Sequence, residues 1–147
     1  MNSEQFQFDE NASAQDGEYI SDKLGDFNAV FTGGEQVKAL NIAIRDSGRN
    51  IVGGVKAGTC FGWLYISDIW LEEHCRGMGL GSRLMSTMET EAIQRGCTSA
   101  WLTTFSFQAK PFYEKHGYQV FSTLSHYPNC ESLWFLKKEL SESKENE

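Results

Sequence analysis

The chain has 147 residues, which suits one domain with an ordinary hydrophobic core. Its formal net charge of −7 argues against nucleic acid or an anionic membrane as a partner, and it favours cationic ligands. No apolar stretch reaches the length of a membrane span and the amino terminus shows no basic or apolar leader, so we expect a cytoplasmic protein.

The four cysteines are widely scattered and form no C-x-x-C pair. No short Cys/His spacing of the kind that binds zinc is present. We therefore expect reduced thiols, no disulfide framework and no metal.

Two short elements are expected near the amino terminus. Phe6 and Phe8 alternate with glutamines, which indicates a short strand with one buried face. Further on, Asp16 is a helix-capping residue type, and Gly25 is a residue type that ends helices in the left-handed conformation. The pattern predicts a short helix between them.

A β-hairpin is predicted next. Apolar residues alternate over 40–44, the segment 46–50 has turn chemistry, and the strand pattern resumes over 51–55. Gly53 and Gly54 inside the second strand indicate either a bulge or a close backbone approach.

The run from Trp63 to Leu71 is nearly all apolar, which predicts a central strand covered on both faces. Ser67 and Asp68 interrupt it. Burying a lone carboxylate costs several kcal/mol unless it is paired or protonated. Asp68 is therefore a candidate functional residue.

Three alternating glycines, Gly77, Gly79 and Gly81, follow this strand and precede an amphipathic helix. Glycine lets the backbone turn and approach a ligand closely, and the free N–H groups at a helix start attract anions. A Walker loop would require Gly-Lys-Ser/Thr, and a dinucleotide loop would require G-x-G-x-x-G. Neither fits, so the turn is interpreted as another kind of phosphate cradle.

The helix after this turn carries apolar residues at helical spacing and should end at Gly96. A strand over 99–104 follows, and then a helix that has Pro111 in its first turn and ends at Gly117. Two closing strands are expected over 118–124 and 132–140. The charged tail, 141–147, is expected to be disordered, which leaves one domain over 1–140.

Two motifs in this order resemble those of the GNAT superfamily of acetyl-coenzyme A-dependent N-acetyltransferases. Arg76, Gly79 and Gly81 match the loop Q/R-x-x-G-x-G/A, and the segment 112–118 looks like F-Y-x-x-x-G-F/Y. With the order of strands, the resemblance extends from Phe6 to Leu140. It implies an α/β (α+β) fold, with a mixed, mostly antiparallel central sheet, helices on both faces, and two central strands that splay apart to admit pantetheine.

The resemblance implies a set of residues that bind acetyl-coenzyme A. Backbone groups at the end of the central strand would bind the pantetheine amides, namely those of Ile69, Trp70 and Leu71. The loop amides, together with Ser82, would hold the diphosphate: Arg76, Gly77, Met78, Gly79, Leu80 and Gly81. Ser106 stands where many members have an asparagine that bonds the cofactor, so a contact from its shorter hydroxyl is a weaker expectation.

The resemblance also implies catalytic and substrate residues. Tyr113 matches the general acid, and a phenol with a pKa near 10 is still protonated at neutral pH. Asp68 is the candidate general base, with a chain of water molecules as the alternative. The acceptor wall would be formed by aromatic and polar residues that ordinary core packing would also explain: Tyr19, Phe27, Asn28 and Phe31.

The expected activity is direct transfer of acetyl from acetyl-coenzyme A to a primary amine of a small, cationic molecule. The alternative is a non-catalytic module on the same fold that binds or senses acyl-coenzyme A, since a fold can persist after its chemistry is lost. A homodimer is compatible with the resemblance, because dimers are frequent in the family. The sequence does not name the acceptor.

Overall fold

A computed structural model describes residues 2–140, so the tail predicted over 141–147 lies outside the described residues. The chain divides into two compact units, Met1–Gln36 and Val37–Glu147, and each is described by itself. The first unit holds η1 (Ser3–Gln5) and α1 (Ala14–Thr32). The elements of the second unit are β1 (Lys38–Arg45), β2 (Ile51–Cys60), β3 (Trp63–Leu71), η2 (Glu73–Cys75), α2 (Leu80–Gln94), β4 (Ser99–Phe105), α3 (Lys110–Lys115), β5 (Gln119–Ser125) and β6 (Ser132–Glu139).

The first unit differs from the sequence prediction at both of its elements. Ser13, not Asp16, caps α1, and the Asp16 carboxylate accepts the Ser13 N–H at 2.8 Å to complete a capping box. The helix continues through Gly25 and ends at Gly33, which has a φ of 71°. The strand expected around Phe6 and Phe8 is wrong, because the described part of this unit offers no second strand to pair with.

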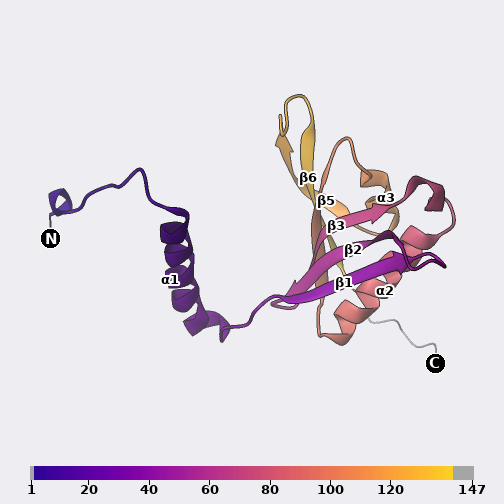
Figure 1. The fold of residues 1–147 in the computed structure, drawn as a ribbon, viewed down its shortest axis with the longest axis horizontal. Helices are drawn as coiled ribbons and strands as arrows, with labels where there is room; N and C mark the ends of the chain where they lie inside the picture. The colour runs from indigo at the N-terminus through magenta and orange to yellow at the C-terminus, as the bar shows by residue number, and fades with distance from the viewer. Residues whose placement is uncertain (1, 141–147) are drawn as a thin grey trace. The chain divides into compact units, whose positions relative to one another are not determined.

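The second unit is built on a six-stranded sheet in the order β1-β2-β3-β4-β6-β5. Every neighbouring pair is antiparallel except β3 and β4, which run parallel. The hairpin, the central strand and the mixed, mostly antiparallel sheet are thus confirmed (Figure 1). Parallel neighbours need a crossover connection, and α2 supplies it between β3 and β4.

One face of the sheet carries the hydrophobic core. The buried side of α2 consists of Leu84, Met85, Met88 and Ala92, the helical spacing that the sequence predicts. These side chains pack in one cluster with Leu64, Ile66, Ala100, Leu102, Tyr118 and Leu136. Partly buried Phe112 and Tyr113 bring α3 against the same cluster.

The opposite face of the sheet corrects a second expectation. Residues of β3 alternate between buried and exposed, and Trp63 and Tyr65 remain 38% and 39% exposed. Within this unit β3 is central, but helices cover only one of its faces. Both α2 and α3 pack on the core face, so the face that carries Trp63 and Tyr65 stays open.

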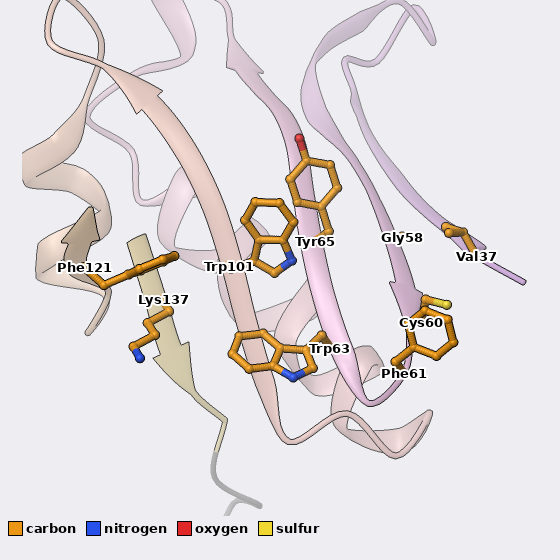
Figure 2. A pocket seen from close by; sticks show the side chains of 9 residues that line it. All are labelled: Val37, Gly58, Cys60, Phe61, Trp63, Tyr65, Trp101, Phe121 and Lys137. Carbon is orange, nitrogen blue, oxygen red and sulfur yellow. The ribbon is translucent and has the colours of Figure 1, made fainter. Parts of the chain in front are cut away.

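A groove of about 660 Å³ lies on this open face (Figure 2). It is lined by Val37, Gly58, Cys60, Phe61, Trp63, Tyr65, Trp101, Phe121 and Lys137. None of the residues that the sequence assigns to a site is among them. None of the helices within residues 2–140 is long and apolar enough to cross a bilayer.

Both alternatives predicted for the two glycines inside β2 are found: close backbone approach at Gly53 and Gly54, and an irregular register that begins at Gly53. A Cβ added to Gly53 would lie 2.6 Å from Leu71 Cδ1, and one on Gly54 would overlap the Ile42 carbonyl oxygen. Gly53 pairs with Ile44 and Ile51 pairs with Arg45, so Val52 is the extra residue of this bulge, and a second register shift lies at Lys56/Ala57.

We predict that Gly54→Ala destabilises the protein by about 1–3 kcal/mol, because the new methyl group must displace the β1 backbone. Urea unfolding followed by circular dichroism measures the change. Lys56→Ala, at an exposed position of the same strand, is the control and should change the free energy of unfolding little. Equal stability of Gly54→Ala and the wild type would contradict this packing.

Candidate active site

The two central strands separate along their length. β3 and β4 are paired only from Trp63 with Ser99 to Ile66 with Leu102. Beyond this point β3 continues to Leu71 with β2 as its partner, while β4 continues to Phe105 with β6 as its partner. The facing edges of the two strands are therefore unpaired after Ile66 and Leu102, and the segment 69–71 can offer backbone groups along one of them.

The glycine turn lies at the carboxyl end of β3, as the sequence predicts. Gly77 and Gly79 have φ values of 78° and 77°, where a side chain would be strained. Gly79 is the N-cap of α2, and no side chain caps this helix. The first backbone bond from the helix to the turn runs from Arg83 N–H to Gly79 O at 3.1 Å. The amides before Arg83 thus form a helix start of the kind that binds anions.

Gly81 has a different role from the other two glycines. It is inside α2, and a Cβ there would lie 3.1 Å from Cε2 of Phe112. The absence of a side chain lets α3 pack directly on the first turn of α2. Sequence reasoning assigned Gly81 to the turn alone and missed this packing role.

The Arg76 guanidinium is hydrogen-bonded to the end of β3. Its Nε donates to the Leu71 carbonyl at 3.2 Å. This bond ties the end of β3 to the start of the turn. A role for the Arg76 backbone in anion binding stays a prediction.

A side-chain pair joins the two motifs. Ser82 Oγ in the first turn of α2 lies 3.3 Å from Nε2 of His116, which follows α3. The His116 ring also meets the Phe112 ring edge-on, with centroids 4.8 Å apart. Sequence reasoning missed His116, although its i, i+4 spacing from Phe112 places both rings on one side of the helix.

The two candidate catalytic residues lie close enough to interact. Burial raises the pKa of Tyr113, and the nearby Asp68 carboxylate raises this pKa further. Tyr113 comes from α3, and Asp68 comes from the part of β3 that pairs with β2 but no longer with β4. The fold thus places a protonated phenol within electrostatic range of a carboxylate.

The burial predicted for the Asp68 carboxylate is wrong. Its side chain is exposed, so no penalty for burying a carboxylate applies. Asp68 Oδ2 accepts a 2.6 Å hydrogen bond from the Ser67 hydroxyl, and the residue pairs with Lys56 in the sheet register. What keeps Asp68 a candidate is its electrostatic effect on the pKa of Tyr113.

Ser106 already has protein partners. Its hydroxyl donates to the Glu131 carboxylate and accepts the Ser132 N–H at 2.9 Å. These bonds fasten the end of β4 to the start of β6. A cofactor contact from Ser106 stays a prediction, and it would have to compete with Glu131 for the only hydroxyl proton.

The four residues predicted to form an acceptor wall all lie on α1, in the first unit. Phe27 and Phe31 form a pair with ring centroids 5.5 Å apart, and Lys23 Nζ lies 5.4 Å from the centre of the Tyr19 ring. No residue of α1, Asn28 included, is buried. Their role in substrate binding stays a prediction.

A cluster of polar side chains connects the elements that carry the site residues. The Glu89 carboxylate of α2 accepts the Tyr118 hydroxyl at 3.0 Å and pairs with Lys138 Nζ at 2.9 Å. The Tyr118 N–H also donates to the Tyr113 carbonyl at 3.1 Å. This cluster joins α2, β6 and the end of α3, and no local spacing in the sequence connects its members.

Within residues 2–140, no group of three or more His, Cys, Asp or Glu side chains is arranged to hold a metal ion. The polar groups assigned to the site include backbone amides, the Tyr113 phenol, the Asp68 carboxylate and the Ser82–His116 pair. Such a set can bind an anion and hold or move protons.

Comparison with known proteins gives consistent results. Residues 5–118 match the model of the Acetyltransferase (GNAT) family. The chain is 32% identical to the acetyltransferase Atu2258 of Agrobacterium fabrum over 127 residues, covering 86% of this chain and 93% of that protein. It is 34% identical to the blasticidin-S acetyltransferase of Streptomyces morookaense over 91 residues, which cover 61% of this chain and 67% of that protein. A crystal structure of an acetyltransferase from Bacillus cereus ATCC 14579 aligns with a TM-score of 0.85 at 32% identity, covering 91% of this chain and 98% of that chain.

We predict that Asp68→Asn lowers the pKa of Tyr113, because the substitution removes the negative charge that helps to raise it. The phenol is titrated by ultraviolet difference spectroscopy, and Tyr113→Phe identifies its signal. An unchanged Tyr113 titration in Asp68→Asn would show that the two side chains do not interact.

Proposed function

Since the chain belongs to the Acetyltransferase (GNAT) family, we propose that it transfers an acetyl group from acetyl-coenzyme A directly to a primary amine of a small, cationic molecule. The observation that carries the proposal is the gap between β3 and β4, with the uncapped start of α2 at its end and Tyr113 beside it.

Acetyl-coenzyme A supplies an activated acetyl thioester when bound. Different groups of residues hold its diphosphate and its pantetheine arm. The amides of the glycine turn and of the first turn of α2 face the diphosphate, where the positive end of the helix dipole favours an anion. The unpaired edge of β3 at 69–71 binds the pantetheine amides as an added strand would. Holding the thioester and the amine together supplies much of the rate enhancement.

Tyr113 holds the proton that the departing sulfur requires. Its raised pKa keeps the phenol fully protonated at neutral pH, so the donor is always loaded. The same raised pKa makes it a weak acid, and the Asp68 carboxylate is one of the two causes. Any step that neutralises Asp68 therefore makes Tyr113 a better proton donor.

Asp68 connects the two proton transfers. A protonated amine must lose a proton before it can attack, and Asp68 is an exposed carboxylate near the acid. When Asp68 accepts that proton, its charge disappears and the pKa of Tyr113 falls. In this scheme deprotonation of the amine prepares the acid for the next step. A water chain at the same position would give no such coupling.

The acceptor class follows from charge and from one relative. The chain has a net charge of −7, and the exposed Asp68 near the gap attracts cations. The blasticidin-S acetyltransferase, by its name, acts on a small molecule. Both support a small cationic amine as the acceptor.

Thiol release from acetyl-coenzyme A, measured over a panel of amines, tests the activity. We expect turnover with cationic small amines and little with neutral or acidic ones of similar size. Tight binding of acetyl-coenzyme A with no turnover for any amine would instead favour the non-catalytic binding module.

We predict that Tyr113→Phe lowers kcat by about 100-fold or more, the usual contribution of a general acid, while the affinity for acetyl-coenzyme A stays close to that of the wild type. Steady-state kinetics and calorimetry separate the two quantities. The control is Tyr127→Phe, which removes a hydroxyl from an exposed tyrosine in the β5–β6 loop. An unchanged kcat in Tyr113→Phe would remove this residue from the mechanism.

A further inference from the structure

The Ser82–His116 pair can adopt two proton arrangements, and only one of them leaves the Ser82 hydroxyl proton free for an anion at the first turn of α2. A serine hydroxyl has one proton to donate. If the neutral imidazole presents a bare Nε2, the Ser82 proton points to His116, 3.3 Å away, and not toward the helix start. If Nε2 carries a proton, His116 donates to Ser82 Oγ and the hydroxyl proton is free for an anion.

We propose that His116 belongs to the diphosphate site, where it releases the Ser82 hydroxyl for the ligand and takes up a proton from solvent when the diphosphate binds. This inference rests on the proposed function, because it assumes that acetyl-coenzyme A binds at the glycine turn. It adds a residue and a proton to that site, and it makes cofactor binding depend on pH.

The geometry keeps His116 in place for this role. Its backbone N–H donates to the Tyr113 carbonyl at 3.0 Å, and its ring packs edge-on against Phe112. Phe112 in turn lies against Gly81, one residue before Ser82. Turning the imidazole away from the helix start would break its edge-on contact with Phe112.

Charged groups from three elements surround the imidazole. Lys115 precedes it on α3, Glu89 faces it from α2, and Lys138 faces it from β6. Burial lowers the pKa of His116, Lys115 and Lys138 lower it too, and Glu89 opposes them. Glu89 and Lys138 pair with each other at 2.9 Å, so their effects partly cancel. His116 is therefore neutral at pH 7 in the free protein.

A bound diphosphate reverses this balance. An anion near an imidazole favours the charged form and raises its pKa, by about one unit or more at short range. Between the two pKa values, binding takes up a proton. Affinity is highest below the pKa of the free protein and falls as pH rises toward the pKa of the complex. The expected loss is roughly tenfold for each unit of pKa difference.

Calorimetry with dephospho-coenzyme A tests the proposal. This ligand keeps the diphosphate but lacks the 3′-phosphate, whose own titration near pH 6 would otherwise contribute. Binding is measured from pH 6 to pH 8 in pairs of phosphate-free buffers that differ in ionisation enthalpy, which gives the number of protons taken up. The variants are His116→Gln, which keeps an N–H donor without a titratable ring, and the control His126→Gln, an exposed histidine of the β5–β6 loop.

We expect the wild type and His126→Gln to take up a fraction of a proton and to bind about tenfold more weakly at pH 8 than at pH 6. His116→Gln should show neither effect. Equal proton uptake by the wild type and His116→Gln would overturn the role of His116 and leave the proposed function standing. No binding of the ligand by any of the proteins would overturn the proposed function itself.

A second measurement needs no variant. The ring protons of His116 are titrated by NMR in the free wild-type protein and in its complex with dephospho-coenzyme A. A higher pKa in the complex supports the proposal, and an equal or lower pKa contradicts it.

Discussion

The parallel pairing of β3 with β4, limited to four residue pairs, is the constraint on which the candidate site depends. Parallel neighbours must be joined by a crossover, and a crossover helix starts near the carboxyl end of the first strand. The start of α2 therefore follows the carboxyl end of β3, in the part of the chain beyond the pairing of β3 with β4. A gap with free strand edges and a helix start with free amides arise together, as consequences of one topology.

The second motif packs on the first one and carries Tyr113, the proposed general acid. Phe112 packs on Gly81, and His116 bonds to Ser82, so two contacts from α3 hold the first turn of α2. The Glu89–Lys138 pair and the Tyr118 hydroxyl fix the far side of the same junction. Tyr113 is thus held by the same contacts that position the first turn of α2, where we propose that the diphosphate binds.

Much of this arrangement was predictable from local sequence. The alternation of apolar residues located β1, β2 and β4, and the glycine turn with its helix was placed correctly because positive φ demands glycine at Gly77 and Gly79. The failures have physical causes. Phe6 and Phe8 alternate like a strand, but alternation does not supply a pairing partner. Gly25 lies inside α1, where a glycine costs only about 1 kcal/mol and need not end the helix.

The site itself was only partly predictable. The motif placed Tyr113 on α3, and its catalytic role stays a prediction, whereas the Asp68 prediction rested on a burial that the exposed side chain does not have. The roles of His116 and Glu89 were not predicted, because their partners Ser82 and Lys138 are 34 and 49 residues away in the sequence. No local pattern indicates such a pair. Long-range pairs depend on the register of the sheet and on how α3 packs on α2, which no short pattern encodes.

The most direct test of the central claim is an NMR titration of the 15N-labelled protein with acetyl-coenzyme A, following the backbone amides of residues 77–82. We expect the largest shifts at these amides, with saturation at one ligand per chain. The aromatic groove around Trp63 and Trp101 provides the contrast, since its indole signals should stay nearly unchanged. Shifts concentrated on those indoles, with the amides of 77–82 unaffected, would contradict the assignment of the diphosphate to the start of α2.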